Sequence, residues 1–192
     1  MKVLLFSFIL GLLVASQGEA QTDASQLTGR WKSHYMAADN IEKITEGGPF
    51  HTFMRYMKFD EENGTALFQF YFKEDGECRG DYTTGTKDGD VYSFQYAGHT
   101  EFRVVRVENN ALLADVINVD ENGKETQLVQ LFGCEACVFM LTEFMILEGI
   151  GDDVGPKCKE EFYNMVREKG IPEENILNFI DQDDCPEEWE KK

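Results

Sequence analysis

Basic side chains are scarce in this sequence. The 192 residues include 18 lysines and arginines against 36 aspartates and glutamates, so the formal net charge at pH 7 is -18. Nucleic acids and anionic lipid surfaces carry charge of the same sign and would be repelled. The composition therefore predicts no nucleic-acid partner, and it favours high solubility.

Metal-ligand and catalytic spacings are also lacking. The three histidines, His34, His51 and His99, lie far apart without the paired spacing of a metal site. Cys134 and Cys137 form a Cys-x-x-Cys, but neither a second ligand pair nor a thioredoxin-like βαβ pattern accompanies it. The carboxylates form no assignable acid–base pair. We therefore predict no metal, no cofactor and no enzymatic activity.

Long apolar runs are missing after the first residues of the chain. No later run reaches the ~20 residues needed to cross a bilayer, so stable membrane insertion is not expected. The early run, Val3 to Val14, follows Lys2 and ends shortly before small residues that include Ala20. This is the pattern of a secretory signal peptide. We expect a signal peptide at 1–20 and a secreted, extracellular single domain over 21–192.

Five cysteines in a secreted chain imply at least one disulfide and leave an odd thiol. Cys78 falls in a predicted strand and Cys185 in the polar C-terminal tail, so a bond between them would tie the tail to the sheet. The residues alone leave that pairing open. They also leave open the states of Cys134, Cys137 and Cys158.

Apolar and polar residues alternate in eight segments separated by polar turns, as in half-buried strands. The predicted strands are Gly29 to Ala38, Phe50 to Phe59, Thr65 to Lys73, Glu77 to Lys87, Val91 to Tyr96, Glu101 to Val107, Ala111 to Val119 and Glu125 to Phe132. The turns contain Asn63-Gly64, Asp75-Gly76, Asp88-Gly89 and Asn122-Gly123, which suit tight hairpins. Successive hairpins exclude a doubly wound α/β fold. We predict an all-β fold with one helix, an eight-stranded up-and-down antiparallel barrel.

One helix is predicted after the barrel, from Pro156 to Lys169. Its apolar stripe, Cys158, Phe162 and Val166, has the i, i+4, i+8 spacing of a single helix face. We expect this face to pack on the outside of the barrel. A short apolar segment at 176–180 is a candidate for a final strand.

Strand parity predicts which side chains line the barrel interior, because alternate residues point inward. The predicted lining is Phe50, Thr52, Met54, Phe68, Phe70, Thr83, Phe94, Tyr96, Phe102, Ala114, Val116, Leu128 and Phe132. An eight-stranded barrel has room for one small ligand. This aromatic lining favours a small hydrophobic ligand, oriented by one hydrogen bond for which Tyr96 is the candidate.

Several blocks of sequence resemble one known family over nearly all of the chain after the predicted signal peptide. They are Gly29-Arg30-Trp31, Ala37-Ala38-Asp39-Asn40-Ile41-Glu42-Lys43-Ile44, Glu46-Gly47-Gly48-Pro49, Gly76-Glu77-Cys78, Tyr96-Ala97-Gly98, Asn118-Val119-Asp120-Glu121-Asn122-Gly123 and Gly170-Ile171-Pro172-Glu173-Glu174-Asn175-Ile176. Together they look like the mammalian odorant-binding, urinary and dander-allergen lipocalins.

The resemblance implies a calyx, the cavity inside the barrel, that binds volatile or lipid-like molecules. It also implies a disulfide between Cys78 and Cys185, and an absence of enzymatic activity. Gly29 and Trp31 would close one end of the barrel rather than contact ligand. The expected partner is a small hydrophobic ligand, and the chain is expected to be a monomer or a weak homodimer.

One segment, 134–155, departs from the family pattern because it is inserted between barrel and helix. It is more apolar than a surface loop should be. Two hypotheses follow from the whole sequence. The first is a secreted carrier of odorant, pheromone or lipid-like molecules in the calyx. The second is a secreted protein-interaction module that has a filled barrel and acts through this segment.

Two minor features complete the prediction. Asn63-Gly64-Thr65 is an N-glycosylation sequon, but Asn-Gly is explained equally well by the hairpin turn that it forms. Residues 181–192 are expected to be a polar C-terminal tail.

Overall fold

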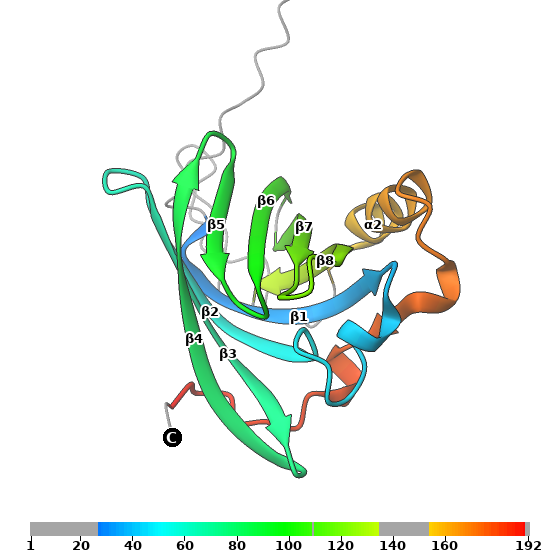
Figure 1. The fold of residues 1–192 in the computed structure, drawn as a ribbon, viewed down its shortest axis with the longest axis horizontal. Coiled ribbons are helices and arrows are strands. Elements are labelled where there is room, and N and C mark those ends of the chain that lie inside the picture. The colour runs from blue at the N-terminus through cyan, green and yellow to red at the C-terminus, as the bar shows by residue number, and fades with distance from the viewer. Residues whose placement is uncertain (1–26, 109, 135–153, 191–192) are drawn as a thin grey trace, which may run out of the picture.

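The computed structural model describes residues 27–108, 110–134 and 154–190 (Figure 1). The predicted signal peptide and nearly all of the inserted segment 134–155 lie outside these residues. The strands are β1 (Gly29–Ala38), β2 (Thr52–Asp60), β3 (Thr65–Glu74), β4 (Glu77–Asp88), β5 (Val91–Gln95), β6 (His99–Glu108), β7 (Ala111–Val119), β8 (Glu125–Cys134) and β9 (Ile176–Asn178). The helix is α2 (Pro156–Glu168), and short 3-10 turns are η1 (Ile41–Lys43), η2 (Glu173–Asn175) and η3 (Ile180–Gln182). None of the helices in the described ranges is long and apolar enough to cross a membrane.

The first eight strands form a closed antiparallel barrel, which confirms the predicted architecture. Each strand from β2 to β7 pairs with the strand that follows it, β8 pairs with β1, and β1 also pairs with β2. The closing contact is short, with Gly29 opposite Met57 and Arg30 opposite Tyr56. β9, the predicted final strand, adds to the outer edge of β1.

The predicted hairpin turns have the backbone geometry that their residues favour. Gly64, Gly76, Gly89 and Gly123 all adopt positive φ, between 58° and 77°. A residue with a Cβ is strained in this region, so glycine is the residue that such turns select. The turns at Gly76 and Gly123 lie at the end of the barrel reached by the β1–β2 loop, and those at Gly64 and Gly89 lie at the opposite end.

The strands separate two apolar clusters. On β8, Leu128 and Phe132 belong to the cluster inside the barrel, whereas Val129 and Leu131 belong to a second cluster outside it. The second cluster contains the predicted stripe of α2, Cys158, Phe162 and Val166, all buried. Figure 1 shows the helix against the outer side of β7 and β8. Alternation along one strand therefore supplies both packing surfaces.

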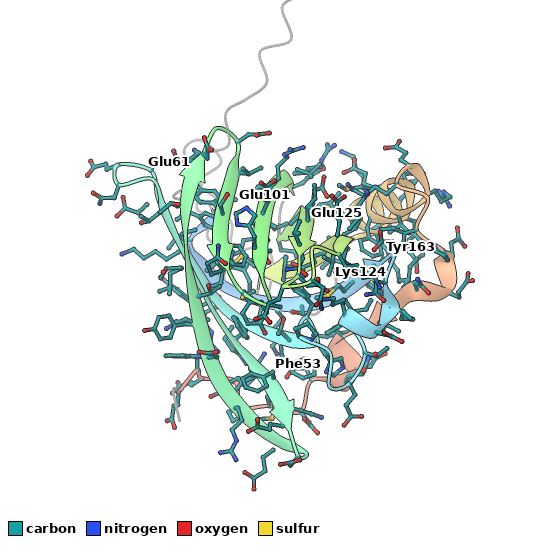
Figure 2. All side chains as sticks on the ribbon, in the orientation of Figure 1. Phe53, Glu61, Glu101, Lys124, Glu125 and Tyr163 are labelled. Atoms are coloured by element: carbon teal, nitrogen blue, oxygen red, sulfur yellow. A yellow bond between two sulfur atoms is a disulfide. The ribbon has the colours of Figure 1, made fainter. Side chains whose placement is uncertain are left out.

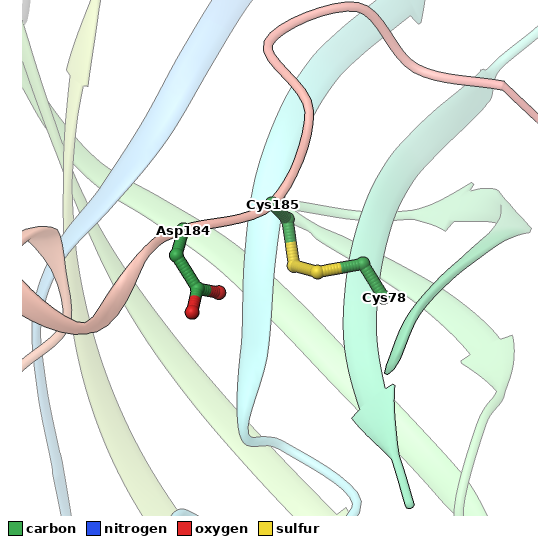
Figure 3. Close-up of side chains that lie close together, drawn as sticks. All are labelled: Cys78, Asp184 and Cys185. Carbon is green, nitrogen blue, oxygen red and sulfur yellow. A yellow bond between two sulfur atoms is a disulfide. The ribbon is translucent and has the colours of Figure 1, made fainter. Parts of the chain in front are cut away.

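A disulfide joins Cys78 of β4 to Cys185, as the resemblance implied (Figure 3). Cys134 is also disulfide-bonded, and Cys158 is a free, buried thiol. Burial is the main cause that raises the pKa of the Cys158 thiol, which keeps it protonated near neutral pH.

The tail after η3 is held against the outside of the barrel rather than extending from it as a solvated segment. The Arg55 guanidinium donates two hydrogen bonds of 2.7 Å to the Asp183 carboxylate, and further bonds to the carbonyls of Pro186 and Cys185. The Trp189 indole N–H donates to the carbonyls of Phe70 and Asp81. The tail therefore covers the outer face of β2, β3 and β4.

Candidate functional site

The interior of the barrel contains a small, largely apolar cavity of about 40 Å³, which is the calyx of this protein. Side chains from seven of the eight barrel strands surround it, because inward-pointing positions converge on the barrel axis. Phe50, two residues before β2, and Tyr96, the residue after β5, complete the lining. The lining residues are Phe50, Thr52, Met54, Phe68, Phe70, Thr83, Phe94, Tyr96, Phe102, Val116 and Gln130. Ten of these eleven are positions that strand parity selects.

Edge-to-face and tilted contacts fix the aromatic side chains of the calyx. Phe68 is central, with its ring centroid 5.3 Å from that of Phe94 and 5.0 Å from that of Phe102. Tyr96 packs edge-on against Phe50 at 5.6 Å and Phe70 at 5.2 Å. Such pairs add stability beyond simple burial. The wall is a connected set of rings rather than a collection of independent side chains.

Tyr96 is the aromatic residue of the calyx lining that carries a hydroxyl, and this hydroxyl already makes a hydrogen bond within the protein. Its hydroxyl donates a hydrogen bond of 2.6 Å to the carbonyl of Pro49, in the loop between β1 and β2. Burial is the main cause that raises the pKa of Tyr96 far above its ordinary value, and the negative charge of Asp81 adds to the shift. The hydroxyl oxygen can therefore still accept a hydrogen bond from a ligand, while its proton is hydrogen-bonded to the loop between β1 and β2.

Three predicted lining residues lie away from this cavity. Ala114, Leu128 and Phe132 are all buried in the barrel cluster, and the Phe132 ring packs 6.4 Å from Phe102. They fill the barrel interior beside the calyx instead of bordering it. These three side chains point inward as predicted, but the cavity occupies only part of the barrel interior.

Gln130 borders the calyx and is absent from the predicted set. It lies on β8 between Leu128 and Phe132, so parity already pointed it inward, and only its polarity argued against a core position. The side chain is 7% exposed, and its amide nitrogen approaches the Met36 sulfur at 3.5 Å. A sulfur is a weak acceptor, so the amide keeps hydrogen-bonding capacity inside an apolar cavity.

Trp31 lies at the opposite end of the barrel interior. Its side chain is completely buried, and its indole N–H donates a 2.8 Å hydrogen bond to the Leu27 carbonyl. It is not among the residues that border the calyx. Gly29, two residues earlier, makes the closing pair with Met57 of β2.

The turn that carries the glycosylation sequon is ordered by its own side chains. The backbone and side-chain amides of Asn63 donate to the two carboxylate oxygens of Asp60 at 3.0 and 2.9 Å. These bonds lower the pKa of Asp60. Asn63 itself is exposed, and its glycosylation stays a prediction.

Within the described ranges, one group of three potential metal ligands gathers, namely Cys78, Asp184 and Cys185 (Figure 3). The two sulfurs are bonded to each other, and the Asp184 carboxylate forms a 2.7 Å ion pair with Lys73. A disulfide sulfur is not a thiolate and does not serve as a metal ligand. The disulfide and the ion pair therefore attach the C-terminal tail to β3 and β4.

Acidic side chains are spread over the outer surface instead of entering the calyx. Figure 2 labels Glu61 on the β2–β3 turn, Glu101 on β6 and Glu125 at the start of β8, all on the outside of the barrel. Within the described part of the chain, the residues that border the calyx carry no formal charge. The lining therefore suits an apolar molecule.

A closed eight-stranded antiparallel barrel, with a ring-lined calyx and one helix packed outside, defines the architectural class of calyx-forming barrels. The chain belongs to the lipocalin / cytosolic fatty-acid binding protein family, whose model matches residues 28–136.

Similar proteins agree with this assignment. An odorant-binding protein of Bos taurus is 34% identical over 173 residues, which is 90% of this chain and 98% of the relative. The crystal structure of a dog lipocalin allergen has a TM-score of 0.73 at 33% identity, covering 84% of this chain and 99% of the other. The complex of bovine odorant-binding protein with undecanal has a TM-score of 0.56 at 34% identity, covering 88% and 98%.

Proposed function

We propose that this protein is a secreted carrier that holds a small hydrophobic molecule, such as an odorant, a pheromone or a lipid-like compound, in its calyx. The observation that carries the proposal is the uncharged, aromatic cavity inside a closed barrel. The bovine relative solved with undecanal supports this class of ligand. Secretion is supported by the signal-like residues 1–20 and by relatives such as a female-specific lacrimal gland protein of Mesocricetus auratus.

Carriage fits the site better than catalysis. A nucleophile or an acid–base pair would have to border the cavity and exchange protons with a bound substrate. The bordering polar groups are two threonines, one glutamine and the tyrosine whose proton is bonded to Pro49. The proposed activity is therefore reversible binding.

The binding free energy should be modest. A ligand of odorant size buries a limited apolar area, at ~25 cal/mol per Å², and part of this gain is lost to the cost of association. Dissociation constants around micromolar are expected. Uptake also requires the rings around the calyx to move apart, because ligand pockets usually measure ~300–1,000 Å³.

Displacement of a fluorescent apolar probe tests the proposal. The delipidated protein should take up the probe at micromolar concentrations, and small apolar compounds should displace it. Phe94→Trp should fill the calyx and abolish uptake, whereas Tyr163→Trp on α2, far from the calyx, should leave it unchanged. If the folded protein takes up no probe at tens of micromolar, the barrel is a packed core, and the segment 134–155 becomes the better candidate for function.

A further inference from the structure

The barrel is not hydrogen-bonded along its full height between β4 and β5. β4 pairs with β3 at ten successive positions, but with β5 at only three, from Thr86 opposite Ser93 to Asp88 opposite Val91. In the described structure, residues 77–85 of β4 therefore have no strand partner on the β5 side. Figure 1 shows β4 continuing well past the end of β5. The wall of the calyx has a gap on this side.

A groove of about 650 Å³ lies over this gap, and we call it the β4–β5 groove. It shares two bordering residues with the calyx, Thr83 of β4 and Phe94 of β5. Both belong to the inward-pointing positions of their strands, yet both reach the outer groove. The two spaces are therefore neighbours separated by these two side chains.

Phe94 is the larger of the two side chains that separate the calyx from the groove. Its side chain is only partly buried, and its ring contacts Phe68 on the calyx side. A Cβ placed on Gly85 would lie 3.2 Å from the Phe94 ring, so the glycine leaves room for the ring beside β4. An aromatic side chain with one free edge can turn at lower cost than one packed on all sides.

A hydrogen bond and an ion pair join the elements at the mouth of the barrel, which is the end reached by the β1–β2 loop. The Tyr96 hydroxyl holds the carbonyl of Pro49, and a 3.1 Å ion pair between Lys43 and Asp120 ties the same loop to the β7–β8 turn. In the described structure the strand pairing of β4 with β5 ends at Thr86, so no backbone ladder spans the gap. A ligand that outgrows the calyx therefore has its easier outlet between β4 and β5.

The volumes show that an odorant-sized chain does outgrow the calyx. Each enclosed water needs ~10–15 Å³ of such space, so 40 Å³ holds about three waters. A chain of ten or more carbon atoms exceeds this space, whereas the groove outside is much larger. A ligand that occupies part of the calyx and part of the groove requires less rearrangement of the protein than a ligand enclosed entirely in the calyx.

The groove differs from the calyx in chemistry. Thr84, Thr86, Ser93 and Gln95 supply neutral hydrogen-bonding groups, and Asp81 is the only carboxylate that borders it. Tyr82 and His99 also border it, and the His99 ring lies 3.5 Å from the Glu101 carboxylate, whereas no lysine or arginine borders the groove. An alcohol can exchange hydrogen bonds with these groups, while a carboxylate would lose hydration beside Asp81 without gaining a lysine or arginine partner.

We propose that the preferred ligand is an elongated, uncharged amphiphile, with its apolar end in the calyx and its hydroxyl end in the β4–β5 groove. The chain passes between Thr83 and Phe94. This inference rests on the proposed carrier function and specifies the ligand class and its orientation.

Competition between matched ligands tests the inference on the full-length protein. The probes are 1-undecanol and undecanoate, each displacing the same fluorescent apolar probe. The variants are Thr83→Val, which removes a hydroxyl shared by calyx and groove, and Thr52→Val, which removes one that borders the calyx alone. Thr84→Val, at an exposed groove position, provides a second variant that leaves the core untouched.

The expected pattern is specific to the head group. The wild-type protein should bind 1-undecanol about tenfold more tightly than undecanoate, because the carboxylate loses hydration beside Asp81 without gaining a lysine or arginine partner. Thr83→Val or Thr84→Val should weaken 1-undecanol binding by about 2- to 10-fold, the range for one lost hydrogen bond. Thr52→Val should change the affinities for 1-undecanol and for the apolar probe by the same factor, because its hydroxyl borders the calyx alone. Thr84→Val, which lies outside the calyx, should leave uptake of the apolar probe unchanged.

The inference is overturned if undecanoate binds as tightly as 1-undecanol, if Thr52→Val weakens binding of the alcohol more than binding of the apolar probe, or if neither groove variant weakens binding of the alcohol. In all of these outcomes the protein still takes up the apolar probe, so the carrier function stands. Absence of probe uptake by the folded wild-type protein would instead remove the carrier function itself.

Discussion

Tyr96 has the most perturbed acid–base equilibrium among the residues of the calyx. The folded protein favours its protonated form, because burial and the negative charge of Asp81 both disfavour the phenolate. A raised pKa gives stabilisation that is complete below the unfolded value of 10.0 and is lost as pH rises above it. The unfolding free energy of the wild-type protein should therefore fall more steeply between pH 10 and 11 than that of Tyr96→Phe, measured by urea unfolding. Parallel pH profiles would show that Tyr96 does not contribute.

Trp31 is expected to serve stability and not binding. The fully buried indole lies at the end of the barrel away from the calyx, so Trp31→Ala leaves a large hole and an unpaired Leu27 carbonyl. The expected loss is about 3–5 kcal/mol of unfolding free energy. Probe affinity of the folded fraction should change little. A variant that melts normally but no longer binds the probe would place Trp31 in the ligand site.

A buried ion pair is one of the contacts that attach the C-terminal tail to the barrel. The side chains of Arg55 and Asp183 are 2% and 5% exposed, and two 2.7 Å hydrogen bonds join them. Asp183→Ala leaves the Arg55 charge buried without its counter-ion, which typically costs about 3–5 kcal/mol. Asp184→Ala is the matched control, because that carboxylate pairs with Lys73 at the surface and should matter little. Chemical denaturation of the two variants should differ clearly, and equal stabilities would contradict this account.

At the scale of the element, the sequence predicted most strand positions but not their irregularities. β1 and β7 have the predicted ends. The pairing of β2 with β3 slips at Arg55, and similar slips occur at His34 and Val105. A bulge inserts one residue into the alternation and reverses the parity after it. At Arg55 the bulge coincides with the side chain that turns outward to hold the tail.

At the scale of the whole molecule, the net charge of -18 acts on any charged ligand. The negative field should repel undecanoate and leave 1-undecanol unaffected. Raising the salt concentration from 0.1 to 1 M shortens the Debye length from ~10 to ~3 Å and screens this repulsion. The affinity of undecanoate relative to 1-undecanol should therefore rise with NaCl in competition titrations. The ratio corrects for general salting-out of apolar chains, and a ratio independent of salt would exclude a field effect.

The sequence by itself determined the barrel, its turns, the outer helix and most of the inward-facing residues. These features follow from local signals, namely period-two alternation, Asn-Gly and Asp-Gly pairs, and an i, i+4, i+8 stripe. The family resemblance added the Cys78–Cys185 disulfide. Each of these signals is contained in a short stretch of chain or in a recognisable block.

Only the tertiary structure decided the size of the calyx, the use of the Tyr96 proton, the anchoring of the tail and the gap between β4 and β5. Pro49 and Tyr96 are 47 residues apart, and Arg55 and Asp183 are 128 residues apart. The gap depends on where one strand's pairing stops, and β4 continues beyond that point with the same alternation. Alternation sets which way each side chain points, but distances between strands depend on how the closed barrel packs, and no local pattern encodes them.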